Sequence, residues 1–166
     1  MASAVRPQVL LSLALLRELY NKVNYYKSMI DRNVRQYNEY KEKISRIMPE
    51  KIRSVDKEIE MLNTLGSHLN SMALFLEGVI LRLETLVTAG NVVVAALALK
   101  NVVKILRQNL RGVPPILAVL VDKLDELSNN ITREIQLSGG AHGSVKMLSP
   151  EASKIVEEAK KVAGIK

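Results

Sequence analysis

The sequence predicts an all-α protein in which a long antiparallel helical hairpin is followed by two further helices and a short C-terminal helix. Three observations lead to this prediction. Apolar residues recur every seven positions in two long segments that a proline separates. Aromatic residues make up only 4% of the chain, which disfavours a β-sandwich or barrel. The 8 glycines and 5 prolines are too few for a disordered or collagen-like chain of 166 residues.

The first helix is expected over residues 8–47. One row of apolar residues repeats every seven positions, and a second row follows three positions later, interrupted by Asn33. Two such rows are typical of a helix that packs along another helix, and we call them together the seam. The rows are Val9, Leu16, Val23, Ile30, Tyr37 and Ile44, and Leu19, Tyr26, Tyr40 and Ile47.

The second helix is expected over residues 50–88, because Pro49 ends the first pattern and is suited to the first turn of a new helix. The seam also shifts phase here, since Ile44 and Ile52 are eight residues apart. Gly66 lies inside the second seam, where it costs about 1 kcal/mol relative to Ala and permits a close backbone approach. The rows are Ile52, Ile59, Gly66, Ala73, Ile80 and Val87, and Val55, Leu62, Leu69, Leu76 and Leu83.

Two shorter helices complete a helical core that is expected to span residues 1–137. The third, over 91–111, has apolar residues in alternating steps of four and three. Glycine and proline at 112–115 break the chain, and the fourth helix is expected over 115–137. The apolar faces consist of Val92, Ala96, Leu99, Val103, Leu106 and Leu110, and of Leu117, Leu120, Leu124, Leu127 and Ile131.

A glycine- and serine-rich stretch at 138–148 predicts a flexible linker before a last helix over 149–163. Ser149 is a suitable N-cap, Pro150 fits the first helical position, and Glu151 places an acid in the first turn. One face of this helix is apolar through Ala152, Ile155, Ala159 and Val162. A helix this short is not stable alone, so we expect it to dock on its own chain or on another.

Basic residues are concentrated in the first third of the chain. The whole chain carries a net charge of +7, and residues 1–57 hold twelve Lys and Arg against six Asp and Glu, a difference of +6. This segment favours an anionic partner such as phosphate or acidic lipid. The alternative is a solvated helix exterior with ion pairs such as Asp31–Arg35 and Glu42–Arg46.

No catalytic or metal-binding constellation is apparent, so we expect a protein that is not an enzyme and has no cofactor. Without cysteine, disulfides, cysteine zinc sites and thiol nucleophiles are excluded. His68 and His142 are far apart, and His68 is best explained as a half-exposed helix residue. Neither a phosphate-binding P-loop nor a nucleophile elbow is present. Asp56, Glu58 and Glu60 are best explained as a solvated helix face.

The stretch 9–16 is apolar on nearly all sides and is flanked by Arg6 and Arg17. It predicts either an anchor on a membrane surface or a helix end buried in an oligomer. A signal peptide is not expected, because no small-residue cleavage site follows. No segment reaches the length of about 18 apolar residues that a membrane span needs. The candidate membrane-binding residues are Val9, Leu10, Leu13, Leu16, Arg17, Lys22, Lys27, Arg32 and Arg35.

All five tyrosines lie between positions 20 and 40. Tyr26, Tyr37 and Tyr40 fall on the seam and are expected in the core. Tyr20 and Tyr25 fall off it, close to Lys22 and Lys27, where the rings could stack on bases or lie at a lipid headgroup layer.

Several segments resemble the archaeal ESCRT-III-like, Cdv-type cell-division family. Residues 76–86 (LEGVILRLETL) resemble the end of that family's second helix, and 110–115 (LRGVPP) is similar to its Leu-x-Gly-Val-x-Pro turn. Residues 122–127 (DKLDEL) fit the helix that follows, and 149–162 is similar to the short last helix of small members. The resemblance covers nearly the whole chain and is to a short member without a winged-helix domain. Ile116 departs from the acid that is common in the family after the proline.

The resemblance implies a cytoplasmic protein, peripheral at the inner face of the membrane, that changes between closed and open forms and polymerises on anionic lipid. The implied partners are further copies of the chain and paralogous subunits. A proline-rich docking motif for the family's AAA ATPase is not apparent. The implied polymer interface is Val94, Leu97, Leu120, Leu124, Ile155, Ala159 and Val162, and the hinge residues are Gly90, Asn91, Gly112 and Pro114.

Two functions of different classes therefore follow from the sequence. The first is a non-enzymatic filament subunit that remodels or severs membrane in cell division or vesicle budding. The second is a basic coiled-coil adaptor or nucleic-acid-binding helical module, which the basic charge and the tyrosines near lysines favour. The second does not account for the excess apolar surface, so nucleic acid is not the expected partner.

Overall fold

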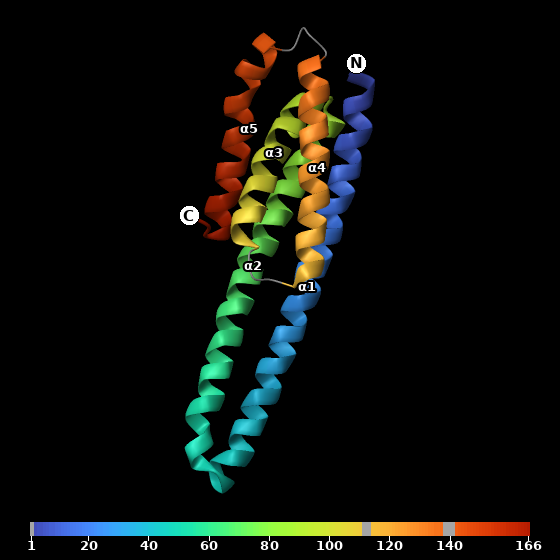
Figure 1. Ribbon diagram of the computed structural model, residues 1–166. Helices are drawn as coiled ribbons and strands as arrows, with labels where there is room; N and C mark the ends of the chain where they lie inside the picture. Colours follow the sequence, from blue (N-terminus) through green and yellow to red (C-terminus); the bar gives the residue numbers. More distant parts are fainter. Residues whose placement is uncertain (1, 111–113, 138–141) are drawn as a thin grey trace.

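The residues that the structure describes fold into five α-helices, which form a body of packed helices and a two-helix extension (Figure 1). The computed structural model describes the backbone of residues 2–110, 114–137 and 142–166, and the side chains of these residues except 2–4 and 142–148. The described residues contain no β-strand, so the predicted all-α fold class is confirmed.

The long hairpin consists of α1 (Ala2–Ile47) and α2 (Ile52–Thr88), joined by Met48 and a 3-10 turn over Pro49–Lys51. α1 begins six residues earlier than the sequence analysis expected and continues through Pro7. The reason lies in packing: Val5 is buried on the same face as Val9, one helical turn later, so the extra turn adds apolar burial. Pro7 itself is exposed.

The seam is well buried only in the part of the hairpin near the N-terminus of α1. Leu16, Leu19 and Val23 are fully buried there against α2 and the later helices. Towards the turn the second row of α1 leaves the interface, because Tyr40 is 49% and Ile47 is 77% exposed. Placing these two residues in the core was therefore wrong: beyond the body, two helices alone offer too little partner surface to cover both rows.

α3 (Val92–Asn109) and α4 (Pro115–Leu137) pack against the hairpin and against each other. α3 contacts α2, α4 and α1, and α4 contacts α1 and α3. The first half of α3 is apolar on several faces because it lies among several helices. Ala95, Ala98 and Val102 are fully buried, and these small side chains allow the helices to approach closely.

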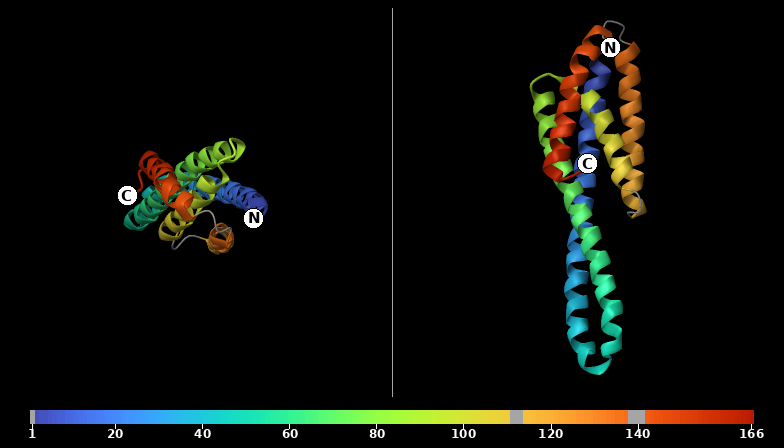
Figure 2. Two further views of the ribbon diagram at one scale, coloured as in Figure 1. Left: turned by 90° about the horizontal axis from the view of Figure 1, so that it is seen from above. Right: turned by 90° about the vertical axis from the view of Figure 1, so that its left-hand side faces the viewer.

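α5 (His142–Ala163) lies along α2 and α3 (Figure 2). Residues 142–148 are helical, which corrects the predicted linker, and residues 138–141 of that linker lie outside the described part. Pro150 lies inside the helix, so Ser149 is not its N-cap. The linker prediction gave too much weight to Gly and Ser, since Lys146, Met147 and Leu148 are good helix formers and a proline disfavours helix on its N-terminal side without forbidding it.

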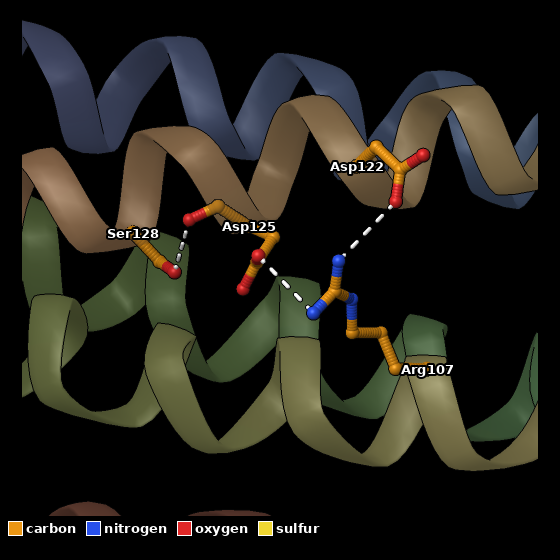
Figure 3. A network of polar contacts seen from close by, with 4 residues as sticks. All are labelled: Arg107, Asp122, Asp125 and Ser128. Atoms are coloured by element: carbon orange, nitrogen blue, oxygen red, sulfur yellow. Dashed lines mark hydrogen bonds and ion pairs between the residues drawn. The ribbon is translucent and has the colours of Figure 1, made fainter.

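Ion pairs on the surface join helices across their contacts. Arg107 of α3 lies between Asp122 and Asp125 of α4, with nitrogen–oxygen distances of 3.4 and 3.3 Å (Figure 3). The Ser128 hydroxyl donates to the main-chain carbonyl of Asp125 at 2.9 Å. Arg82 of α2 pairs with Glu158 of α5 at 2.9 Å. These side chains are largely exposed, so each pair contributes at most about 1 kcal/mol and apolar burial holds the body together.

The α1–α2 hairpin extends well beyond the body, as Figures 1 and 2 show. We call residues 31–65 the projecting hairpin. Within this fully described range only Ile44 and Val55 are buried, and neither belongs to the main hydrophobic core. Its end, around Met48, is the part of the protein farthest from the N-terminus of α1 and the C-terminal end of α4.

Candidate functional surfaces

The apolar start of α1 is turned mostly into the body. Val9, Leu13 and Leu16 are at most 6% exposed, because positions i, i+4 and i+7 share one helix face and this face packs on the core. Leu10 and Leu11, on the opposite side, are 46% and 52% exposed. Of the four apolar residues of the predicted anchor, Leu10 is thus the one whose side chain is exposed. The alternative of a buried helix end is closer to the structure, but the burial occurs within one chain.

Some basic residues of α1 pair with polar side chains of α2. The Arg17 Nε donates to Glu84 at 2.7 Å, and the Lys27 Nζ donates to Asn70 at 2.7 Å. Lys22 is half-buried, whereas Arg32 and Arg35 are exposed.

The local ion pairs expected on the exterior of α1 do not form. In the described part of the chain neither Asp31–Arg35 nor Glu42–Arg46 makes an ion pair. The exposed side chains of Arg35 and Arg46 therefore remain available to an external anion.

The turn of the projecting hairpin brings together features that the sequence analysis did not connect. Ile47 is 77% and Met48 is 40% exposed at the very end of the molecule. Exposed Lys43, Arg46, Lys51 and Arg53 lie within a few residues of them. The phase shift of the seam at Pro49 could have indicated this exposure. The last apolar residue before a turn has no partner helix opposite it to cover its side chain. We call residues 43–53 the hairpin turn.

The predicted polymer interface lies mostly inside the body. Val94, Leu120, Leu124, Ile155 and Ala159 belong to the core, and Leu97 packs partly against it. The prediction that these residues face a neighbouring subunit is corrected for this conformation, because α3, α4 and α5 cover one another's apolar faces. Of the seven predicted interface residues, Val162 alone is exposed, at 74%.

An apolar groove of about 540 Å³ lies beside the contact between α2 and α5. Val162 lines it together with Leu74 and Leu81, which are 40% and 57% exposed. The two helices approach closely at Gly78, where an added Cβ would lie 3.9 Å from the Cβ of Ala159. The groove is thus an apolar surface next to the docked last helix.

The turn between α2 and α3 has a well-defined helix-ending geometry. Gly90 has a φ of +86°, its N–H donates to Val87 at 3.1 Å, and the Asn91 N–H donates to Leu86 at 2.8 Å. This pair of bonds is a Schellman motif, for which glycine is best suited. Pro114 accepts a hydrogen bond from the Leu117 N–H at 3.0 Å as α4 begins. Gly112, the remaining predicted hinge residue, lies outside the described residues.

The titratable groups considered in the sequence analysis take structural roles. The half-buried His68 donates through Nε2 to the main-chain carbonyl of Asn109, at the end of α3. Asp56 pairs with Lys41 across the projecting hairpin at 2.6 Å. No group of three or more His, Cys, Asp or Glu side chains that could hold a metal ion occurs among the described residues. The His142 side chain lies outside the described set.

Tyr25 is 62% exposed, and its ring meets that of Tyr26 edge-on at a centroid distance of 5.6 Å. Tyr20 packs partly against the core, so the two tyrosines expected to stack on bases do not form one exposed platform.

In the ranges that the structure describes, none of the helices has a stretch both long and apolar enough to cross a membrane.

The chain is similar to a curated protein named Cell division protein B1, from Sulfolobus acidocaldarius. The two are 32% identical over 106 residues, which are 64% of this chain and 50% of the relative, so the chain spans half the length of that protein. No protein-family model matches the chain. No solved structure matches it. The relative supports the resemblance to the archaeal ESCRT-III-like, Cdv-type family that residues 76–86 and 110–115 indicate.

Proposed function

We propose that the protein is a non-enzymatic subunit that polymerises on anionic membrane and remodels or severs it, in archaeal cell division or vesicle budding. The observation that carries the proposal is the 32% identity over 106 residues to an archaeal protein named for cell division. The order of the helices, with a long basic hairpin first and a docked last helix, agrees with the family that the sequence resembles. Its partners are further copies of the chain, paralogous subunits and acidic lipid.

Exposed apolar side chains offer surface for a neighbouring subunit. Leu10 and Leu11 on α1, Leu81 on α2, and Ile116 and Val119 on α4 are each at least 43% exposed. They lie on the outer faces of helices whose inner faces already form the core. Covering them in a filament removes apolar surface from water at about 25 cal/mol per Å². These residues replace the buried ones of the original interface prediction.

The docked α5 supports a closed form in this conformation. It packs on α2 and α3 through Ala152, Ile155, Val156 and Ala159, and Arg82 binds Glu158 at its edge. Release of α5 would expose this apolar face together with the part of α2 and α3 beneath it. The open form that polymerises would arise by this release of α5. The turn at Gly90 and Asn91 would act as the hinge between α2 and α3.

The test is vesicle flotation with purified protein at low and high salt. We expect the protein to float with vesicles that contain phosphatidylglycerol and to remain at the bottom with pure phosphatidylcholine, with binding that weakens as salt rises. A matched titration with single-stranded and double-stranded DNA separates the alternative function. Tight, salt-dependent DNA binding without flotation would replace the proposal with a nucleic-acid module.

A further inference from the structure

We propose that the hairpin turn, residues 43–53, is the surface through which the protein meets anionic lipid. In this arrangement Ile47 and Met48 enter the headgroup layer, and the basic residues around them bind lipid phosphates. The inference rests on the proposed function and specifies a surface for it, at a different place from the anchor that the sequence analysis predicted.

The first argument is that two large apolar side chains of the hairpin turn are exposed and do not contribute to the hydrophobic core. Ile47 is 77% exposed, more than any other large apolar side chain among the described residues, and Met48 beside it is 40% exposed. Both lie at the end of α1, where the chain reverses. Two large apolar side chains at the end of a rod can enter a lipid surface without unfolding anything.

The second argument is the charge around this apolar pair. The hairpin turn holds four basic residues and one acid, Glu50, which gives a net charge of +3. All four basic side chains are exposed, and none of them forms an ion pair with a residue that the structure describes. The nearby ion pair, Lys41–Asp56, lies just outside the turn. A ring of free cations around exposed apolar side chains is complementary to an anionic lipid surface.

The third argument is shape. The projecting hairpin carries its turn away from the body, so a flat surface can reach the turn without touching any other helix (Figure 1). At the opposite end of α1, Leu10 and Leu11 are also exposed, but Arg17 is bound to Glu84 and Glu18 lies next to it. Arg6 is also exposed there, but the hairpin turn has four exposed basic side chains that form no ion pair with a described residue.

Lipid fits this surface better than nucleic acid does. Single-stranded nucleic acid is held by aromatic rings that stack on bases, and the hairpin turn contains no aromatic residue. Aliphatic side chains such as Ile47 and Met48 have no role on a phosphate backbone, whereas they gain by entering an apolar layer.

The decisive experiment uses a single tryptophan as a depth probe, because the natural chain contains none. Ile47→Trp places the probe in the hairpin turn. Leu137→Trp is the matched control, since Leu137 is 75% exposed and ends α4 at the other end of the molecule. The probes are vesicles of phosphatidylcholine with and without phosphatidylglycerol, containing lipid brominated on the acyl chain near the headgroup. Flotation of each variant is measured in the same samples.

We expect the tryptophan at position 47 to shift its emission to shorter wavelength and to be quenched by brominated lipid in anionic vesicles alone. The tryptophan at position 137 should do neither. Flotation without quenching at position 47, or quenching at position 137 instead, would overturn the inference and leave the proposed function standing. If the natural protein does not float with anionic vesicles at all, the proposed function itself is contradicted.

A charge-matched pair of variants tests the basic ring separately. In the first, Lys43, Arg46, Lys51 and Arg53 are all changed to Gln; in the second, the same change is made at four exposed basic residues of the body, Lys100, Lys104, Lys123 and Arg133. Both variants have the same net charge. We expect the first to lose about a thousandfold in vesicle affinity at low salt and the second less than about tenfold. Equal losses would mean that net charge alone binds the protein to lipid, which contradicts a specific surface.

Discussion

The body and the projecting hairpin are built from the same two helices, yet they are stabilised in different ways. In the body, α1 and α2 are covered by α3, α4 and α5, and side chains such as Phe75 and Leu83 are fully buried. In the projecting hairpin, α1 and α2 have only each other, and residues on one row of the seam become exposed. The comparison indicates that α1 and α2 can extend past their supporting helices at little cost, and that apolar residues left exposed there are available for another role.

Replacing Phe75 by Ala should produce the largest effect on stability. Phe75 is fully buried in α2, so the change leaves a cavity in the body and should lower the free energy of unfolding by about 3–5 kcal/mol. Tyr40→Ala in the projecting hairpin is the control, and because Tyr40 is 49% exposed it should cost less than about 1 kcal/mol. Urea unfolding followed by circular dichroism measures both. Equal losses would mean that the two regions are stabilised alike.

Gly90→Ala should have the next largest effect, because it strains the turn between α2 and α3. The φ of +86° is unfavourable for any residue with a Cβ, so we expect a loss of about 1–2 kcal/mol in the free energy of unfolding. Nothing lies within 4 Å of the position that a Cβ would take, so the loss would come from backbone strain alone. Gly90→Asn is a useful companion, since Asn tolerates this conformation better and should lose less. No loss in the Ala variant would show that the turn relaxes freely.

Two glycines of α2 allow a comparison between the middle of the body, at Gly78, and its border with the projecting hairpin, at Gly66. Gly78→Ala in the body places its Cβ 3.9 Å from the Cβ of Ala159, an ordinary contact, so the gain in helix propensity should stabilise the protein by about 1 kcal/mol. Gly66→Ala places its Cβ 3.3 Å from the Cγ2 of Ile30, a stiff β-branched side chain. The crowding should offset most of the gain, leaving a change below about 0.5 kcal/mol. A gain at Gly66 equal to that at Gly78 would show that the seam yields easily there.

The ion pairs should produce the smallest changes. Arg107→Gln removes both contacts with α4 (Figure 3), and Lys41→Gln removes the pair with Asp56 in the projecting hairpin. All these side chains are at least 29% exposed, so each variant should cost less than about 1 kcal/mol, and less still at high salt. Thermal unfolding at two salt concentrations is sufficient. A larger, salt-independent loss at Arg107 would mean that the α3–α4 contact depends on this side chain.

Most of the fold could be predicted from the sequence because its information is local. Helix boundaries follow from Pro49 and from the glycines near 90 and 112. The apolar face of each helix follows from the spacing of its apolar residues along the sequence. The start of α5 was misplaced because Pro150 and a Gly/Ser-rich composition are equally compatible with a helix start and with a helix that continues through them. The start of α1 was misplaced because Val5 is buried by other helices of the body. Such contacts between distant segments cannot be recognised from a local sequence pattern.

The candidate surfaces were harder to predict, because apolar periodicity does not say which chain covers a face. Leu13, Val94 and Ile155 have the pattern of buried residues, and the sequence alone could not distinguish burial in the body from burial against a neighbour. Ile47 was assigned to the seam by its spacing, although at the hairpin turn its partner helix no longer covers it. Both errors have one origin: they concern contacts between distant parts of the chain.

Negative-stain electron microscopy of the purified protein, with and without vesicles that contain phosphatidylglycerol, tests the central claim most directly. The account predicts filaments, spirals or coated tubules on the anionic vesicles. Where a coat is ordered enough to average, the hairpin turn should face the lipid. Smooth vesicles beside monodisperse particles, at all salt and protein concentrations tested, would contradict a membrane-assembling subunit.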